Sequence, residues 1–187
     1  MFNFARHKDF RMKKLSMKEL QRFSVPEFRG MQKLPLALVL ENVRSGLNVG
    51  SVFRTADAFA VERIFLCGIT AQPPHREILK TALGSTETVD WIYRADALET
   101  IRQLRSEGFR IYGVEQTTEK TWLQDLQADP SEKYALVFGN EVNGVAIDTL
   151  MACDGVLEIP QFGTKHSLNI AVAAGIAVWE FARQLRL

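Results

Sequence analysis

The stretch PLALVLENVRSGLNVGSVFRTADAFAVERIFLC, residues 35–67, decides the fold. It begins with an apolar run at residues 36–41 and ends with another at 63–67, each with the length and composition of a buried strand. The residues between the two runs have helical periodicity. Two strands joined by a helix form a crossover connection, so this pattern predicts a parallel pair of strands.

The same alternation continues along the rest of the chain. Strand-like runs follow at 110–114, 134–138 and 155–159, and a weaker candidate lies at 89–93. The expected fold is therefore α/β, with a mostly parallel sheet and helices on both faces. Ligands of such sheets bind beyond the carboxyl ends of the strands, so chemistry is expected in the loops that follow the strands.

A long helix is expected at the end of the chain, from Ser167 to Leu185. The small residues of this helix, which let a neighbouring backbone come close, are Ala171, Ala173, Ala174, Gly175 and Ala177. Tight packing within the core explains such a row, and so does the seam of a dimer. The sequence does not separate these two interpretations.

The first 33 residues are strongly basic. They contain nine Lys or Arg against three Asp or Glu, a balance of +6, whereas the other 154 residues contain fourteen against nineteen, a balance of −5. A basic arm suits a polyanion such as RNA, because each neutralised phosphate releases counterions. A solvated tail that only aids solubility is the alternative. Within the arm, Ser16 and Glu19 fit a capping box and predict a short helix near residues 17–23.

Composition sets the class of protein. A chain of 187 residues that is 47% hydrophobic can form one compact domain, expected over residues 34–187. It contains no apolar run of membrane-spanning length, and its charged N-terminus does not match a secretory signal, so a cytoplasmic protein is expected. Cys67 and Cys153 lie beside apolar runs without C-x-x-C spacing. Both thiols are expected to be buried and reduced, with no disulfide and no metal site.

The first of three loops with candidate chemistry lies within the stretch quoted above. Asn48 is a suitable N-cap for the helix, and Gly50 keeps the first turn open. Arg54 follows about one turn later and is expected on the same face, aimed at whatever the helix N-terminus binds. A lone Arg on a helix is commonly a surface charge, so the residue type alone does not make Arg54 a candidate. Its spacing from the helix N-terminus does.

The second loop lies in VFGNEVNGV, residues 137–145, where a strand ends. Gly144 permits a backbone conformation that other residues disfavour. A plain strand-to-helix turn is one explanation of this segment. Glu141 favours another, because a charge placed directly after a buried run needs a partner or a purpose.

The third loop leads from the strand at 155–159 into the final helix. Ser167 is a suitable N-cap for that helix. If capping is the whole role of Ser167, the neighbouring His166 and Asn169 are incidental. These polar residues are otherwise candidates for a site.

Together, the three loops resemble the SpoU group of RNA 2′-O-ribose methyltransferases within the SPOUT superfamily. The motifs, in family order, are N-x-G-x-x-x-R-T-A-D-A-F from Asn48, G-N-E-x-x-G from Gly139, and I-P-x-x-G-x-x-x-S-L-N from Ile159. The resemblance spans residues 36–187. GVEQT at 113–117, IPQ at 159–161 and the ending VWEFARQ look like the methyltransferases that modify the D-loop guanosine of tRNA.

The resemblance implies a fold, a cofactor and a partner. SPOUT proteins have a deep trefoil knot near the C-terminus, an exception to the near absence of knots in proteins. They bind S-adenosylmethionine bent within the knot and act as homodimers. By motif position, the residues expected around the cofactor are Glu115, Gly139, Ile159 and Leu168. Those expected in the catalytic region are Asn48, Arg54, Glu141, Ser167 and Asn169, with the arginine reaching the site from the partner subunit.

Three positions depart from the family pattern. Val142 stands where many members have Gly, Ala60 replaces a common Gly, and Gln161 replaces a frequent Met. None of these departures removes a polar catalytic position. Val142 is the one expected to alter the backbone of the second loop.

Arg54 needs a chemical role that an arginine can perform. The family proposal has it activate the ribose hydroxyl, but a guanidinium stays protonated near neutral pH and is a poor general base. We expect it instead to clamp the adjoining phosphate with both nitrogens and to stabilise developing negative charge. The group that accepts the hydroxyl proton stays open.

Alternative functions share parts of this pattern. A ribosomal RNA methyltransferase has the same fold and motifs, although the long N-terminal domain common in such members is missing from this sequence, which favours tRNA. A catalytically silent RNA-binding factor would keep the fold, but the five intact polar positions argue against it. A dinucleotide-binding domain would need G-x-G-x-x-G after the first strand, which GLNVGS at 46–51 does not fit.

Overall fold

The first strand, β1 (Leu34–Glu41), lies near the middle of a seven-stranded sheet in the computed structural model, which describes residues 12–16, 19–20 and 22–186. The strand order is β3-β2-β1-β6-β4-β7-β5, and every pair is parallel. The other strands are β2 (Val61–Cys67), β3 (Asp90–Arg94), β4 (Phe109–Val114), β5 (Thr121–Trp122), β6 (Lys133–Phe138) and β7 (Gly155–Glu158). All six predicted strands are thereby confirmed. The trefoil knot stays a prediction.

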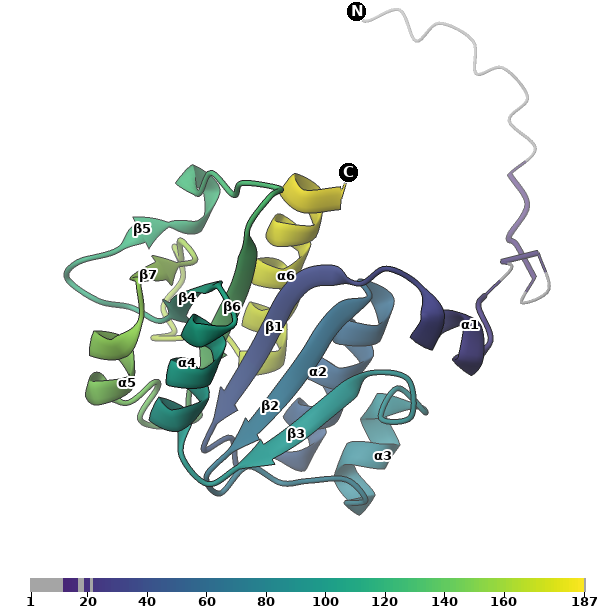
Figure 1. Ribbon diagram of the computed structural model, residues 1–187, viewed down its shortest axis with the longest axis horizontal. Coiled ribbons are helices and arrows are strands. Elements are labelled where there is room, and N and C mark those ends of the chain that lie inside the picture. Colours follow the sequence, from purple (N-terminus) through teal and green to yellow (C-terminus); the bar gives the residue numbers. More distant parts are fainter. Residues whose placement is uncertain (1–11, 17–18, 21, 187) are drawn as a thin grey trace, which may run out of the picture.

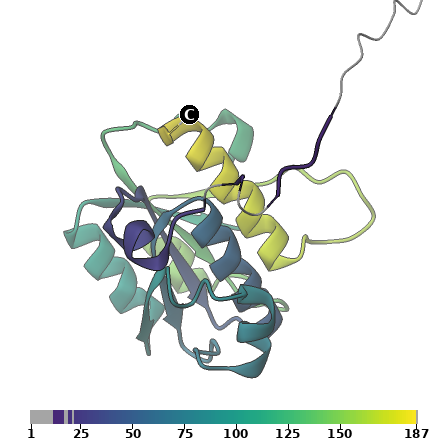
Figure 2. The same cartoon turned by 90° about the vertical axis from the view of Figure 1, so that its right-hand side faces the viewer.

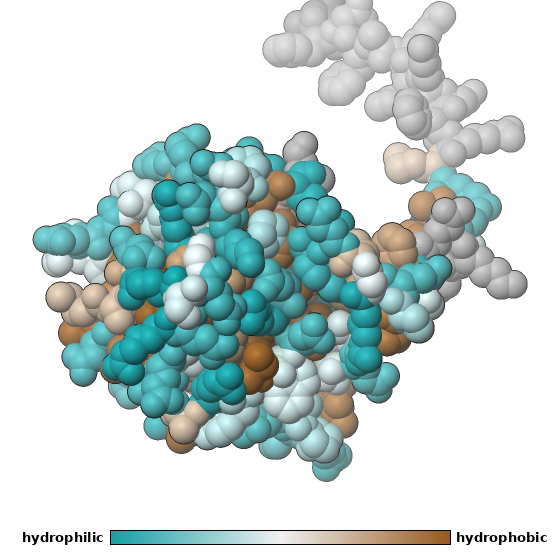
Figure 3. All heavy atoms as spheres, in the orientation of Figure 1, coloured by the Kyte–Doolittle hydropathy of each residue, from teal (hydrophilic) through white to brown (hydrophobic). Residues whose placement is uncertain are grey.

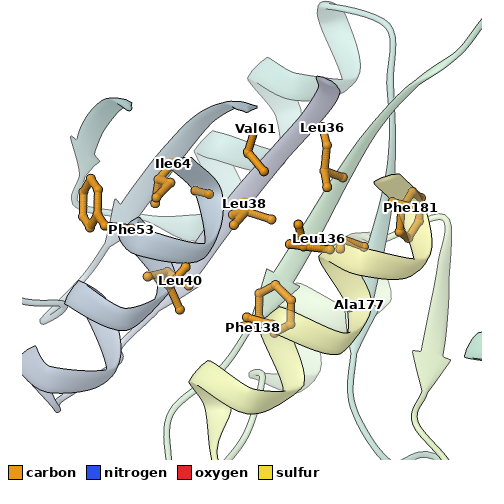
Figure 4. Packing of buried hydrophobic residues seen from close by; sticks show 14 of the residues in the cluster. Leu36, Leu38, Leu40, Phe53, Val61, Ile64, Leu136, Phe138, Ala177 and Phe181 are labelled. Atoms are coloured by element: carbon orange, nitrogen blue, oxygen red, sulfur yellow. The ribbon is translucent and has the colours of Figure 1, made fainter. Parts of the chain in front are cut away.

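Helices cover both faces of the sheet, as expected (Figure 1). One face carries α2 (Gly46–Ala58), α3 (Arg76–Ala82) and α6 (Ile170–Arg186), and the other carries α4 (Ala97–Ser106) and α5 (Ile147–Ala152). Alternation along β1 divides the core between the faces. Leu36, Leu38 and Leu40 pack toward α2 and α6 (Figure 4), whereas Ala37 and Val39 belong to the cluster under α4.

The N-terminal helix lies later than the sequence predicted. The Ser16 backbone N–H does donate to the Glu19 carboxylate at 2.8 Å, but the described residues there form a turn, and positions 17, 18 and 21 of the predicted helix lie outside the described residues. The helix is α1 (Val25–Gly30), preceded by a second capping box in which Ser24 donates to Glu27. Pro26 stands in the first turn of α1, where its missing N–H and fixed φ suit a helix start.

α1 fastens the end of the basic segment to the body of the protein. Phe28 is buried, and the Lys33 ammonium lies over its ring. The Arg29 guanidinium donates to the Glu87 carbonyl, with its Nε at 3.1 Å. Part of the predicted arm therefore packs against the domain.

Two helices begin at residues other than those predicted. Ser45, not Asn48, caps α2, because its hydroxyl accepts the Asn48 backbone N–H at 3.3 Å. α6 begins at Ile170, and Asn169, not Ser167, accepts the Ala171 backbone N–H at 2.8 Å. The side chain of Asn48 and the amide nitrogen of Asn169 are consequently available for other contacts.

The small residues of α6 serve the core of this chain. Ala174 and Ala177 are fully buried where α6 packs on α2 and β1. On the outer face of α6, Val172, Ile176 and Trp179 are exposed to 51%, 38% and 47%. Packing therefore explains part of the row, and an apolar stripe remains outside.

The cysteines differ in burial. Cys67 is buried as predicted, but Cys153 is only partly buried because it ends α5 near the surface. Burial raises the pKa of the Cys67 thiol to about 11 and that of Cys153 to about 12.

Within the described residues, no helix has the length and apolar character needed to cross a membrane. The face shown in Figure 3 is mostly hydrophilic, with hydrophobic residues in small groups.

Candidate active site

A pocket of about 540 Å³ opens where the chain leaves β4, β6 and β7. The pocket lies where a ligand site was expected, beyond the carboxyl ends of parallel strands. Seven of the nine predicted site residues line the pocket: Glu115, Gly139, Glu141, Ile159, Ser167, Leu168 and Asn169. Asn48 adjoins the pocket through hydrogen bonds, whereas Arg54 lies elsewhere.

Glu141, Asn48 and Asn169 form a hydrogen-bonded chain. The Glu141 carboxylate accepts the Asn48 side-chain amide at 3.1 Å, and the Asn48 oxygen accepts the Asn169 amide at 3.0 Å. The same carboxylate accepts the backbone N–H groups of Arg44 and Ser45, each at 3.0 Å. Residues from all three predicted loops are thus connected directly.

The start of α2 is the electrostatic partner that Glu141 needed. Partial burial alone would raise the pKa of this carboxyl, but the hydrogen bonds from the Arg44 and Ser45 backbone and from Asn48 outweigh burial and hold the pKa below its usual value. Glu141 is therefore ionised at neutral pH. As an acceptor of several donors, it orients Asn48.

The second loop keeps its shape through two glycines and an asparagine. Gly144 has a φ of 67°, and a Cβ there would collide with the Glu115 carboxylate, which accepts the Val145 backbone N–H at 3.0 Å. A Cβ on Gly139 would meet the backbone of Gly144. Asn140 is buried and donates to a carbonyl of the first loop at 2.8 Å. The loop is consequently packed backbone to backbone.

The third loop projects from the body as the yellow-green segment before α6 in Figure 2. Residues 161–167 are all exposed, and Phe162 has 97% of its surface exposed. The Gln116 side chain donates to the His166 carbonyl at 2.6 Å and ties this loop to the end of β4. Ser167 and Leu168, at the end of this loop, line the pocket.

Arg54 does not face this pocket, although we expected it to point at whatever the N-terminus of α2 binds. It lies one turn after Gly50, as expected, but on the face of α2 that packs against α3. Six residues separate it from Asn48, which turns the helix by about 240° and advances it about 9 Å. Arg54 instead lines a separate hollow between α2 and α3. Within one chain, it is apart from the other predicted catalytic residues.

Residues 35–179 match the family described as the SpoU rRNA methylase family. The chain belongs to this family. The match covers all three loops around the pocket and confirms the resemblance carried by the motifs. It leaves the individual residue roles as predictions.

The names of similar proteins refer to different RNAs. The chain is 33% identical over 151 residues to the 23S rRNA (guanosine-2′-O-)-methyltransferase RlmB of Neisseria meningitidis, covering 80% of this chain and 59% of that protein. An AdoMet-bound rRNA methyltransferase from Sinorhizobium meliloti has a TM-score of 0.75 at 29% identity, covering 88% of this chain and 62% of that one. A structure concerned with 2-OH methylation of C/U34 on tRNA has a TM-score of 0.71 at 28% identity, with coverage of 80% and 95%. The chain spans about three fifths of the length of the first two proteins.

Sequence reasoning missed several residues that shape this SpoU-family pocket. Besides Asn140 and Gln116, Glu41 is buried at the end of β1, where its carboxylate accepts the Ala146 backbone N–H at 2.9 Å and the Thr149 hydroxyl at 2.6 Å. A charged residue at the end of a buried strand is the sequence feature that indicates such a contact. Glu41 has this feature, but only Glu141 was predicted from it.

The three departures have different structural settings. Ala60 has a φ of 52°, in the left-handed region, which explains why glycine suits this position. Val142 lines the pocket with 77% of its surface exposed. Gln161 also lines the pocket and is exposed. Only Ala60 departs at a position with an unusual backbone conformation.

Proposed function

We propose that this chain is an S-adenosylmethionine-dependent RNA methyltransferase that acts on a ribose 2′-hydroxyl. The observation that carries the proposal is the hydrogen-bonded chain of Glu141, Asn48 and Asn169 at the edge of the pocket. Membership of the SpoU family and the names of its relatives support the same activity. Intact polar positions also speak against a catalytically silent RNA-binding factor.

The pocket suits S-adenosylmethionine in size and chemistry. Its volume of about 540 Å³ lies within the usual range of small-molecule sites. Ile159, Leu168 and Ala173 provide apolar surface for an adenine ring, while the Glu115 and Glu141 carboxylates and the loop backbones supply polar groups. The cofactor, when bound, supplies a methyl group on a positively charged sulfur.

The protein's own contribution is positioning. Glu141 fixes the Asn48 amide, so that Asn48 and Asn169 present oriented polar groups where a ribose would approach the pocket. Arg54 would hold the neighbouring phosphate through two nitrogens and stabilise negative charge that develops on the ribose oxygen. A guanidinium stays protonated near neutral pH, so Arg54 does not act as a general base there.

We further propose that the enzyme is a homodimer in which Arg54 serves the partner's pocket. In one chain, Arg54 does not line the pocket that holds the other candidates. Beside α2, the exposed stripe of Val172, Ile176 and Trp179 on α6 gives a second copy an apolar surface to cover. A dimer through this stripe would hide the stripe and bring a second α2 near the site.

Ribosomal RNA is the substrate we propose first. Similar chains include a 23S rRNA guanosine methyltransferase at 33% identity. The second candidate is tRNA, which the motifs at 113–117 and 159–161 favoured. A tRNA-methylating structure, of which the chain covers 95%, supports that alternative.

The test is methyl transfer from labelled S-adenosylmethionine to purified 23S rRNA and to total tRNA. Ribose methylation protects the adjoining phosphodiester from alkali, so label in alkali-resistant dinucleotides is the expected result. Mapping the same site in RNA from cells lacking the protein identifies the nucleotide. Label only on bases, or no transfer to either RNA, would refute the proposed activity.

A further inference from the structure

A hollow between α2 and α3 carries two positive charges and no negative one. It is lined by Ser51, Arg54, Thr55, Ala58, Phe59, Lys80 and Thr81, and we call it the α2–α3 hollow. Arg54 and Lys80 are both exposed. Among the described residues, neither forms a salt bridge or a side-chain hydrogen bond. Two like charges that share one hollow without a counterion favour an anionic ligand.

Close packing of the two helices fixes the walls of this hollow. A Cβ on Gly50 would collide with the Thr81 hydroxyl and the Ile78 carbonyl, so α2 and α3 touch at backbone distance there. The Thr81 hydroxyl also donates to the Leu47 carbonyl at 2.9 Å. Arg54 lies four residues after Gly50, on the same side of α2 and therefore toward α3. Both cations thus extend from a rigid base.

The remaining donors in the hollow suit an oxyanion. The Ser51 hydroxyl is engaged, because it donates to the Leu47 carbonyl at 2.8 Å. Thr55, on the turn after Ser51, forms no side-chain hydrogen bond within the described part of the chain. A guanidinium, an ammonium and a hydroxyl therefore remain to bind a group with several acceptor oxygens.

We infer that the α2–α3 hollow seats a backbone phosphate of bound RNA, with Lys80 as a positioning residue beside Arg54. The inference rests on the proposed function, which supplies the polyanion. Arg54 alone can hold one phosphate. Lys80 adds a second charge on a separate helix, so that the orientation of the RNA backbone is fixed as well as its position. Lys80 acts on RNA affinity and leaves the S-adenosylmethionine pocket unaffected.

The experiment compares Lys80→Gln with wild-type protein in binding to a fluorescently labelled RNA stem–loop over a range of salt concentrations. Loss of one phosphate contact should weaken binding several-fold and reduce the slope of log K against log salt by about 0.7 to 0.9. Lys80→Arg, which keeps the charge, should restore the slope. Arg102→Gln removes another exposed charge, from α4 on the opposite face of the sheet, and should leave the slope unchanged.

An unchanged slope in Lys80→Gln, or an equal change in Arg102→Gln, would overturn the inference. A shift of Lys80→Gln in oligomeric state by sedimentation would assign the hollow to a protein contact and overturn it as well. Calorimetry with S-adenosylmethionine should give the wild-type affinity. Failure of the proposed function is distinguishable, because wild-type protein would then bind the RNA without transferring a methyl group.

Discussion

The side-chain amide of Asn169 donates to the side-chain oxygen of Asn48 at 3.0 Å, across 121 residues of chain. Asn48 uses its own amide to donate to Glu141, so both ends of this one side chain are fixed. The Asn169 oxygen is also occupied, by the Ala171 backbone N–H. These hydrogen bonds therefore fix which end of the Asn48 and Asn169 side-chain amides carries the oxygen and which the nitrogen.

Replacing Glu141 by Gln should reduce stability in a pH-dependent way. At neutral pH we expect a loss of about 0.5–2 kcal/mol in the free energy of unfolding, because the carboxylate caps the start of α2 and holds Asn48. The folded-state pKa of Glu141 is lowered, so its contribution is present above the unfolded value of about 4.3 and is lost as the pH falls through the folded value. Denaturant unfolding from pH 7 to acidic pH measures the difference.

The control for that measurement is Glu119→Gln. Glu119 is exposed, and its side chain makes no hydrogen bond among the described residues. The two variants should differ from each other at pH 7 and converge in acid. A Glu141→Gln difference that is constant with pH would contradict the lowered pKa.

Gly144→Ala should weaken S-adenosylmethionine binding. The position has a φ of 67°, and the added methyl group would displace the Glu115 carboxylate from the Val145 backbone N–H. Strain of about 1–3 kcal/mol at such a position corresponds to a loss of roughly tenfold in affinity for each 1.4 kcal/mol. Gly163→Ala is the matched control, since a Cβ there meets nothing within 4 Å. Equal affinities of the two variants by calorimetry would argue against this account of the second loop.

Arg54→Ala should abolish methyl transfer while cofactor affinity stays near that of wild-type protein. The reason is its position in the α2–α3 hollow, outside the proposed cofactor pocket. Arg54→Lys should recover little activity, because an ammonium cannot reproduce the bidentate guanidinium contact. Single-turnover kinetics and calorimetry measure the two quantities. Equal losses in both would refute the role assigned to Arg54.

Mixed dimers test whether Arg54 acts across subunits. Arg54→Ala chains are combined with Gly139→Trp chains, which should not bind the cofactor because even a Cβ at this position meets the backbone of Gly144. The mixture should recover about a quarter of wild-type activity, because half of the dimers are mixed and each keeps one complete site. Verified heterodimers without activity would exclude a shared site. Wild-type protein that is a monomer by sedimentation would exclude the proposed dimer.

S-adenosylmethionine should bind in the presence of a chelator. The pocket residues include carboxylates and one histidine, but the described part of the chain contains no group of three or more His, Cys, Asp or Glu arranged to hold a metal ion. Calorimetry with and without EDTA should give the same affinity. Binding that vanishes with EDTA would count against the cofactor chemistry proposed here.

Removing residues 1–23 should weaken RNA binding and reduce its salt dependence without changing cofactor affinity. This segment has seven Lys or Arg against two Asp or Glu. The cut spares α1, whose Phe28 is buried against the domain, so the free energy of unfolding should change little. A wild-type salt slope in the truncated protein would show that the segment only aids solubility.

The sequence predicted the sheet and most of the pocket, and it failed where tertiary contacts decide. The sheet was predictable because its central strands β1 and β6 each contain a continuous apolar run, whereas the two-residue strand β5 carries no such signal. The caps of α2 and α6 were assigned wrongly because Ser45 and Asn169 compete with equally good capping residues nearby, and only Glu141 and Asn48 decide between them. The contacts of Glu41 and Asn140 were out of reach, because local pattern cannot state which distant backbone group a polar side chain meets.

The hydrogen bonds that shape the pocket also set when it can form. Those from Glu41, Asn42 and Asn48 to the later loops span 93 to 121 residues. Contacts of such sequence separation form late, because a long loop must close before they stabilise anything. During synthesis, the first loop leaves the ribosome long before Asn169 exists. The cofactor pocket is therefore the last part of the protein to mature, and a nascent chain acquires it only after the third loop has been made.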